Sequence, residues 1–378
     1  MAMASLLLNT FPYSLFLYLL LVPNPVAARY SALFAFGNSL TDTGNMAHFG
    51  GDSVATNHLP YGETYFRRPS GRYSDGRLVV DFIAQALGLP LIPPYLAGNN
   101  SKENLKQGAN FAVGGACALS NAFFEAQGVN VTWEDYSLNT QLSWFDQYRR
   151  SSPSRKRPTQ TPNLVRAEVE LLFFLGEMGI NDYTRLLLEK GVNSTDIQSY
   201  VPVVVQAIGA TIDSLIQRGA ETMLVAGIYP LGCSASYLTV FQQDLDPKTG
   251  CVEWANDLAK SHNLQLLLEL KRLRRTHRHS KILYADYYRP MMHLYQHPDT
   301  FGVRETRAAC CGGEGPYNFS LSVACGSPGS SLCGDPSSYA CWDGLHLTEA
   351  AHSIVARHIL KSTGLDPDLQ IELLTGNV

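Results

Sequence analysis

The order of apolar runs along this chain constrains its fold more than any other sequence feature. Short runs of β-forming residues alternate with amphipathic helical stretches, which is typical of βαβ units and of a parallel sheet covered by helices on both faces. Strands are expected at residues 31–36, 110–113, 170–175, 222–226 and 282–285, and helices at 78–87, 138–149, 201–218, 252–275 and 348–362. The sequence therefore predicts an α/β fold.

Residues 1–28 are expected to be a signal peptide and not part of the fold. A mostly apolar stretch from Phe11 to Val22 precedes Val26-Ala27-Ala28, a small-residue site of the kind that signal peptidase cuts. The stretch is too short to span ~30 Å of hydrocarbon, so we expect no stable membrane insertion. No Pro/Gly-rich linker followed by a new periodic pattern is visible in residues 29–378, which are predicted to form a single domain.

Four N-x-S/T sequons also fit a secretory route and are expected to mark exposed, glycosylated loops: Asn99, Asn130, Asn193 and Asn318. The chain has eight cysteines, and an oxidising compartment permits disulfides. Five lie between residues 310 and 341 and three lie earlier, so complete pairing within the chain would require a bridge between the two groups. Cys233 with Cys251 is the one local bridge that we predict.

The charge distribution argues against nucleic-acid binding. The formal net charge is −4, and the basic runs at residues 149–157 and 271–279 suit a solvated loop and the carboxyl end of a helix. The cationic residues are therefore expected to form ordinary surface.

A Gly37-Asn38-Ser39-Leu40 turn follows the first apolar run directly, and Asp343-Gly344-Leu345-His346 lies near the far end of the chain. A buried strand that ends in a small-residue turn would expose a serine hydroxyl at the carboxyl edge of the sheet, where open α/β folds place their sites. The i, i+3 spacing lets Asp343 lie beside His346. Ser39 is thus the candidate nucleophile of a serine hydrolase.

Four sequence blocks resemble those of the GDSL lipases and esterases, also called SGNH hydrolases, in the form used by secreted plant members. They are residues 36–45, 108–115, 176–183 and 342–346, and residues 74–77 and 310–313 extend the resemblance over nearly all of the chain after residue 28. The resemblance implies a three-layer α/β/α fold with a flavodoxin-like parallel sheet. Four blocks in the family's order are a far more specific signal than any one of them.

The resemblance also implies roles for individual residues. Ser39 would attack the ester carbonyl, His346 would accept its proton, and Asp343 would orient the His346 ring. The oxyanion hole would comprise the Ser39 amide, the amide of Gly115, with Gly114 as the alternative, and the side-chain amide of Asn181. No metal or cofactor is expected.

Asn38 departs from the family pattern, which carries aspartate at this position. Asparagine keeps an acceptor oxygen and tolerates unusual turn backbone. We therefore expect the geometry of Ser39 to survive, and an Asn38→Asp change to alter the catalytic rate by about tenfold or less.

These observations predict a secreted serine esterase of the apoplast or cell wall, with the vacuole as the alternative compartment. Its substrates would be acetyl, acyl or hydroxycinnamoyl esters of small metabolites or cell-wall polysaccharides, and its oligomeric state is open. One alternative is an acyltransferase that uses the same triad. Another is a catalytically silent carbohydrate-binding protein of the wall, for which Asn38 is the only sequence support.

Overall fold

A five-stranded parallel sheet forms the centre of the protein. The computed structural model describes residues 30–97, 105–151, 170–242 and 245–365. The strands are β1 (Tyr30–Phe36), β2 (Gly108–Asn110), β3 (Glu170–Leu175), β4 (Thr222–Ala226) and β5 (Lys281–Ala285). They lie in the order β2-β1-β3-β4-β5, and every neighbouring pair is parallel. This is the flavodoxin-like order, which confirms the predicted fold class.

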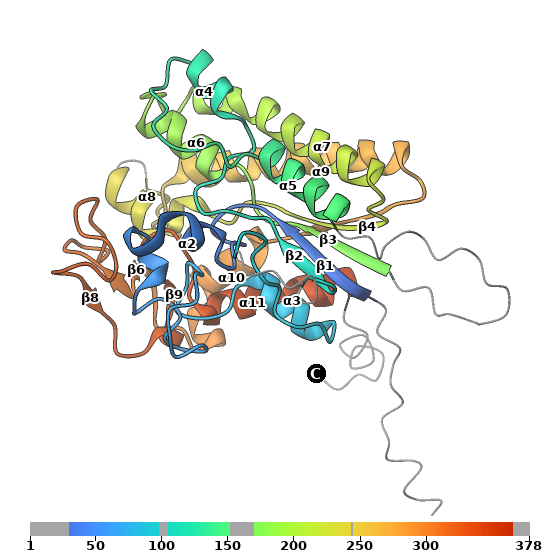
Figure 1. Cartoon of the computed structure of the whole chain (residues 1–378). Coiled ribbons are helices and arrows are strands. Elements are labelled where there is room, and N and C mark those ends of the chain that lie inside the picture. Colours follow the sequence, from blue (N-terminus) through green and yellow to red (C-terminus); the bar gives the residue numbers. More distant parts are fainter. Residues whose placement is uncertain (1–29, 98–104, 152–169, 243–244, 366–378) are drawn as a thin grey trace, which may run out of the picture.

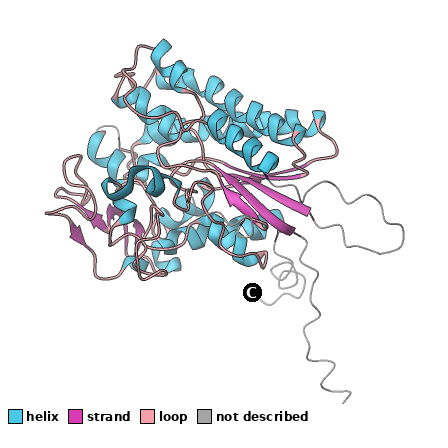
Figure 2. Cartoon of the chain, in the orientation of Figure 1, coloured by secondary structure: helices cyan, strands magenta, loops and turns pink. Residues whose placement is uncertain are grey.

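Helices cover both faces of the sheet, as Figures 1 and 2 show. One layer contains α5 (Leu138–Ser151), α7 (Val201–Gln217) and α9 (Glu253–Thr276), and the other contains α3 (Val79–Ala86), α10 (Tyr288–Gln296) and α11 (Glu349–Thr363). The remaining α-helices of the described residues are α2 (Asn45–Gly50), α4 (Asn121–Ala126), α6 (Ile180–Leu188) and α8 (Ala235–Val240). The protein is thus a three-layer α/β/α structure.

The five expected strands and five expected helices are all present, with one strand displaced. Residues 110–113 were expected to form the second strand, but β2 occupies Gly108–Asn110. The Asn110 side chain accepts a hydrogen bond from the Ala112 amide at 2.8 Å. The amides of Phe111 and Val113 still donate to the carbonyls of Ala35 and Gly37, at 2.7 and 3.2 Å, so the predicted segment continues beside β1 beyond the end of the regular strand.

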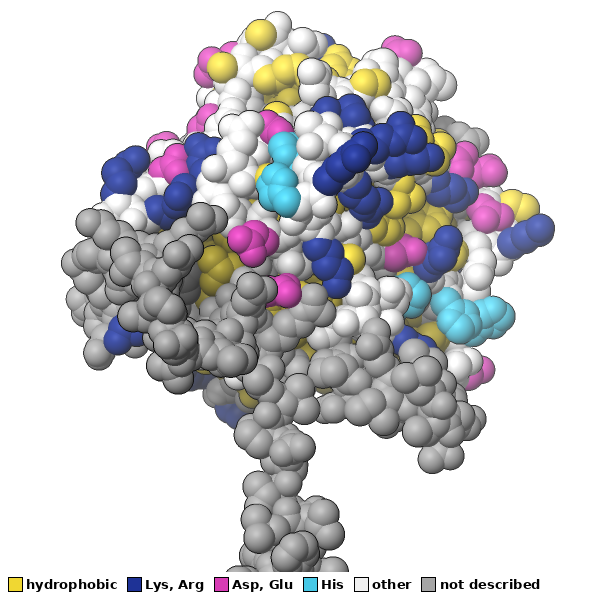
Figure 3. All heavy atoms as spheres, turned by 90° about the vertical axis from the view of Figure 1, so that its right-hand side faces the viewer, with side chains coloured by type: hydrophobic (Ala, Val, Ile, Leu, Met, Phe, Trp, Pro, Cys, Tyr) yellow, Lys and Arg dark blue, Asp and Glu magenta, His cyan; other side chains and the backbone are white. Residues whose placement is uncertain are grey.

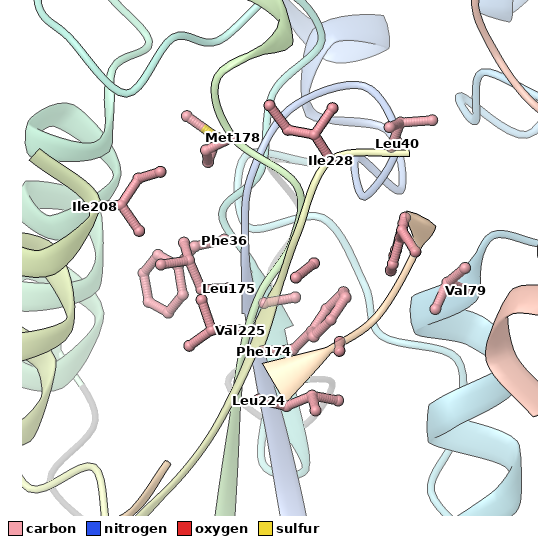
Figure 4. Close-up of a cluster of buried hydrophobic side chains, with 14 of the residues drawn as sticks. Phe36, Leu40, Val79, Phe174, Leu175, Met178, Ile208, Leu224, Val225 and Ile228 are labelled. Atoms are coloured by element: carbon pink, nitrogen blue, oxygen red, sulfur yellow. The ribbon is translucent and has the colours of Figure 1, made fainter. Parts of the chain in front are cut away.

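The core lies on both faces of the sheet because its central strands are buried on both sides. Six of the seven residues of β1 and all five of β4 are buried. Figure 4 shows Phe36, Leu175 and Val225 toward the α7 side, where Ile208 meets them, and Phe174 and Leu224 toward the α3 side, where Val79 lies. Burial of each such side chain contributes about 1.5–3 kcal/mol, so this sheet is a rigid base for the loops at its carboxyl edge.

One strongly apolar segment and one strongly basic segment have ordinary places in the structure, the first partly in the core and the second at the surface. The stretch Ile197–Gln217 is long and apolar enough to cross a membrane, but half of its most apolar window is buried within the protein. The basic end of α9 is engaged locally: Arg272 pairs with Glu269 at 2.6 Å and Arg274 donates to the Ile282 carbonyl at 2.8 Å. Figure 3 shows the neighbouring face, on which cationic, anionic and apolar side chains are mixed.

Three disulfides join cysteines that are close in sequence. Cys233–Cys251 confirms the predicted local bridge, and Cys310–Cys333 and Cys311–Cys325 close the Gly/Ser-rich segment on itself. The remaining cysteines, Cys117 and Cys341, are free and buried. Complete pairing, which would have required a bridge between the early and late cysteines, is therefore not what this structure shows. Each thiol makes a local polar contact instead: Cys117 Sγ lies 3.9 Å from the Gly115 carbonyl oxygen, and Cys341 Sγ accepts from the Gly344 amide at 3.3 Å.

We expect non-reducing peptide mapping to find these three bridges and free thiols at Cys117 and Cys341. The Cys310–Cys333 disulfide joins cysteines that are 23 residues apart. Its removal in a Cys310→Ser/Cys333→Ser variant should lower the free energy of unfolding by about 2–4 kcal/mol. Cys117→Ala is the matched control and should shift the unfolding midpoint much less. A bridge between Cys117 and Cys341, or eight free thiols, would contradict this pattern.

Candidate active site

The turn after β1 is fixed from two sides. Gln141 on α5 accepts a hydrogen bond from the Gly37 amide at 2.9 Å and donates one to the Gly37 carbonyl at 2.9 Å. The carbonyl of Asn38 accepts from the amides of Thr41 and Asp42, at 3.0 and 2.9 Å. Ser39 lies between these anchors with 6% of its surface exposed. Its side chain is thus held in one place at the carboxyl end of the sheet.

Ser39, His346 and Asp343 form a continuous hydrogen-bonded chain. The Ser39 Oγ lies 2.8 Å from His346 Nε2, and His346 Nδ1 lies 2.8 and 2.7 Å from the two oxygens of Asp343. The first contact joins residues that are 307 positions apart in sequence. The structure therefore brings together the three residues predicted to act as nucleophile, base and orienting acid.

Asp343 stays ionised although its side chain is only 8% exposed. Burial alone would raise its pKa, but the His346 ring, the His346 amide and the Tyr61 hydroxyl lower the pKa below its ordinary value. Tyr61 donates to Asp343 Oδ2 at 2.7 Å. Burial and the adjacent carboxylate raise the pKa of Tyr61 well above its usual range, so this phenol remains a donor. Tyr61 thus helps to keep the orienting acid charged.

Tyr73 covers the other side of the histidine. Its ring lies 4.7 Å from the His346 ring, centre to centre. The same ring lies over Gly114, where an added Cβ would come within 2.6 Å of its tip. Only glycine fits beneath the phenol at this position. Tyr73 thereby packs the histidine loop against the second sequence block.

The Ser74-Asp75-Gly76-Arg77 block ties the histidine loop to the body of the protein. Ser74 Oγ donates to the Leu347 carbonyl at 3.0 Å. Asp75 accepts from the Glu349 amide at 2.7 Å, and Arg77 pairs with the Glu349 carboxylate at 2.7 Å. Together with the Thr348 cap on α11, these bonds fix the chain immediately after His346.

The disulfide-rich segment fixes the chain immediately before the histidine. Cys310 and Cys311 each donate a backbone hydrogen bond, to the carbonyls of Cys341 and Trp342, at 3.0 and 2.7 Å. Trp342 in turn donates to the His346 carbonyl at 2.7 Å, which closes the turn that carries Asp343. The two local bridges at Cys310 and Cys311 therefore support the active site as well as the fold.

Two backbone amides in the predicted oxyanion hole are available for a ligand. The Gly114 amide already donates to Asp42 Oδ2 at 2.8 Å. Within the residues that the structure describes, the amides of Ser39 and Gly115 donate to no protein acceptor. Gly115 has φ of +79°, a conformation that glycine adopts without strain. This distinction favours Gly115 over the alternative, Gly114.

Helix α6 holds the loop of Gly115 with three side chains from its first turns. Asn181 Nδ2 donates to the Ala116 carbonyl at 2.8 Å, which leaves its second N–H hydrogen for a ligand. Arg185 donates to the Gly115 carbonyl at 3.3 Å. Asp182 accepts from the amides of Ala118 and Leu119, at 2.9 and 3.0 Å. Asn181 is not the N-cap of α6, because Gly179 occupies that position.

Histidines away from the triad are structural. His352 is buried in α11 and neither ring nitrogen has a hydrogen-bond partner; burial and His346 lower its pKa to about 3. His277 pairs with Asp213 at 2.6 Å near the end of α9. Among the described residues, no group of three or more His, Cys, Asp or Glu side chains is arranged to hold a metal ion.

Sequence reasoning assigned no role to several side chains that shape this site. Tyr61, Tyr73 and Gln141 come from loops and a helix whose proximity only the fold reveals. Glu177 lies in one of the four sequence blocks that resemble the family, directly after the glycine that follows β3. Its position at the carboxyl edge of the sheet could have identified it as a site residue from the sequence.

The fold and this constellation define a serine hydrolase built on a flavodoxin-like sheet. Residues 33–359 match the model of the GDSL-like lipase/acylhydrolase family. The chain is 42% identical over 359 residues to a sinapine esterase of Brassica napus, covering 91% of this chain and 88% of that protein. It is 41% identical over 362 residues to a GDSL esterase/lipase of Arabidopsis thaliana, with 94% and 90% covered. The protein belongs to the GDSL esterase/lipase family of carboxylic ester hydrolases.

Tyr61→Phe should lower kcat about tenfold, because a hydrogen bond to a charged group contributes about 1.5–3 kcal/mol and this one orients Asp343. KM should change little, since Tyr61 contacts the acid and not the ester. Steady-state kinetics on one good ester measures both constants. Tyr65→Phe is the control, because Tyr65 is an exposed phenol that accepts only from Gln85. Equal effects of the two changes would exclude this role for Tyr61.

Proposed function

We propose that this protein hydrolyses carboxylic esters through an acyl-Ser39 intermediate. The observation that carries the proposal is the chain of short contacts from Ser39 Oγ through the His346 ring to Asp343. Each contact lies within hydrogen-bond range, so a proton can move from the serine to the histidine without rearrangement.

In the acylation step, Ser39 Oγ attacks the ester carbonyl while His346 Nε2 takes its proton. The carbonyl oxygen becomes an oxyanion, for which the free amides of Ser39 and Gly115 and the second N–H of Asn181 are the proposed donors. The tetrahedral intermediate then expels the alcohol, which receives the proton from His346. The acyl group remains on Ser39.

Deacylation repeats these steps with a second nucleophile. Water gives its proton to His346, attacks the acyl-Ser39 carbonyl and releases the carboxylic acid. An acceptor alcohol in place of water would make the protein an acyltransferase, so products are to be analysed with and without added alcohols. Transfer that outruns hydrolysis would replace the esterase assignment.

The proposed substrates are acetyl, acyl or hydroxycinnamoyl esters of small metabolites or wall polysaccharides. A relative with 42% identity is a sinapine esterase, so sinapine is the first ester to test. A cluster of three aromatic side chains supports an aromatic acyl group: Phe49 on α2 is 45% exposed and stacks on Tyr136 at 4.9 Å, with Trp144 beside them. The cluster is linked to the turn of Ser39 through Gln141, whose Nε2 donates to the carbonyls of both Gly37 and Tyr136. Two other aromatic residues of this region have different roles. Phe145 belongs to the hydrophobic core, and the Trp133 ring packs against the Arg185 guanidinium at 3.5 Å.

We also propose that the protein is secreted to the apoplast or wall, with the vacuole as the alternative. The three disulfides support an oxidising compartment. The proposed signal peptide at residues 1–28 and the sequon at Asn99 lie outside the described residues.

Ser39→Ala should abolish turnover on a panel of acetyl, longer acyl and phenolic esters while leaving the unfolding midpoint nearly unchanged. His346→Ala should be comparably severe, and Asp343→Asn should retain partial activity because it impairs orientation without removing the base. A fluorophosphonate probe should label Ser39 in the wild type only. Labelling would exclude the silent binding protein as an alternative.

His352→Gln is the matched histidine control, since His352 lies on the same segment without contact to Ser39. The His352→Gln variant should be less stable than wild type, with a lower unfolding midpoint, while the kcat of its folded fraction should stay close to wild type. A loss of kcat equal to that of His346→Ala would show that the base has been assigned to the wrong histidine.

Glycans are expected at Asn130 and Asn193, which are exposed, and not at Asn318. Asn318 departs from the expectation of a free loop: it is half-buried, its Nδ2 donates to the Ala309 carbonyl at 2.8 Å and its Oδ1 accepts from Ser331 at 2.7 Å. The side-chain bonds of Asn193, in contrast, go only to Thr195 and Asp196 in its own exposed turn. Glycopeptide mass spectrometry of the secreted protein measures occupancy at each site. Full occupancy at Asn318 would contradict this prediction.

A further inference from the structure

Asn38 makes hydrogen bonds in two directions directly beside the nucleophile. Its Oδ1 accepts from the Leu40 amide at 3.0 Å, and its Nδ2 donates to Glu177 Oε2 at 2.7 Å. Only 2% of its surface is exposed. The side chain therefore links the turn after β1 to the turn after β3, and Ser39 lies on the first of these.

Glu177 is fully buried, and no cation of the described residues pairs with its carboxyl group. Its second oxygen accepts from the Ile180 amide at 3.2 Å. The titratable groups that interact with it come from several elements: Asp182, Tyr183, Tyr229, Tyr237 and Tyr287. His262, which contacts Tyr183 at 2.8 Å, is uncharged because burial lowers its pKa to about 3. Burial raises the pKa of Glu177 to about 8, although the hydrogen bonds from the Asn38 side chain and the Ile180 amide act to lower it.

We propose that Asn38 and Glu177 form a matched amide–carboxyl pair that positions Ser39, and that the amide lets this pair hold whether or not Glu177 is protonated. The role rests on the proposed function of Ser39 as nucleophile. Asn38 and Glu177 are positioning residues, because they act on the reaction only through the turn that carries Ser39.

The donor and acceptor pattern gives each substitution a distinct outcome. Asn38→Asp places two carboxyl groups in contact, and one of them must be protonated for the contact to hold. Glu177→Gln leaves one amide hydrogen pointing at another donor, either Asn38 Nδ2 or the Ile180 amide, whichever way the new side chain turns.

Exchanging both residues restores every bond. In the Asn38→Asp/Glu177→Gln variant, the new aspartate accepts from the Leu40 amide and from Nε2 of the new glutamine, and the glutamine oxygen accepts from the Ile180 amide. One buried carboxylate is present, as in the wild type. A merely structural defect at either position would not be repaired in this way, so the exchange tests the pairing itself.

The experiment measures kcat and KM for these four proteins on one ester from pH 5.5 to 9. Asn38→Asp should lie within about tenfold of wild type at pH 5.5 and fall about a hundredfold below it at pH 9, when the shared proton is lost. Glu177→Gln should be about tenfold to a hundredfold slower at every pH. The double variant should return to within about fivefold of wild type throughout, with these changes in kcat rather than in KM.

Thermal unfolding gives a readout that does not need an ester. A folded-state pKa above the unfolded value of 4.5 means that the stabilising effect of protonated Glu177 is complete below about pH 4.5 and is lost as the pH rises through about 8. The midpoint of Asn38→Asp should therefore fall more steeply between pH 6 and 9 than that of wild type, and the double variant should regain the wild-type slope.

Two results would overturn the pairing. One is a double variant whose losses in midpoint and kcat equal the combined losses of the single variants. The other is a ratio of Asn38→Asp to wild-type kcat that is constant from pH 5.5 to 9. If the wild type cleaved no ester and took up no serine probe, the proposed function would fail, while the four midpoints would still decide whether the two residues are paired.

Discussion

The position of β1 between β2 and β3, hydrogen-bonded to both in parallel, is the constraint on which the rest of the structure depends. Because the three strands end at the same edge, the turn of Ser39, the loop of Gly115 and the start of α6 meet there. The connections after β1 and β3 then leave on opposite faces of the sheet, so the space between them is not filled by a continuing helix. The positions of the proposed nucleophile and of its proposed oxyanion donors are therefore set by strand order.

The base and the acid depend on a second set of interactions, because the sheet does not supply them. Asp343 and His346 belong to a short turn after the disulfide-closed segment, and backbone bonds from Cys310 and Cys311 hold its first half. Its second half is held by Ser74, Asp75 and Arg77 through Leu347 and Glu349. A turn of so few residues has little core of its own, and these polar anchors restrict it to the geometry that reaches Ser39.

The sequence predicted the fold class and the regular elements closely, because the periodicity of β1, β3, β4 and the long helices directly reflects burial. It placed β2 two residues too late, although residues 111–113 still donate backbone hydrogen bonds to the β1 side at Ala35 and Gly37. Among the site residues, those in short motifs could be found. Tyr61 and Tyr73 could not, because each contributes through a contact across the fold, to Asp343 and to His346. The free thiols at Cys117 and Cys341 likewise follow from tertiary distances.

The separation of 307 residues between the two ends of the Ser39–His346 contact has a consequence for biosynthesis. During translation the nucleophile emerges among the first residues of the fold and the base among the last. A nascent or truncated chain that ends before residue 346 carries a serine without a partner to deprotonate it, and a chain whose late cysteines are still reduced lacks the frame that delivers the histidine. Under the proposed mechanism, hydrolytic activity thus requires that synthesis has passed residue 346 and that the late disulfides which hold the histidine loop have formed.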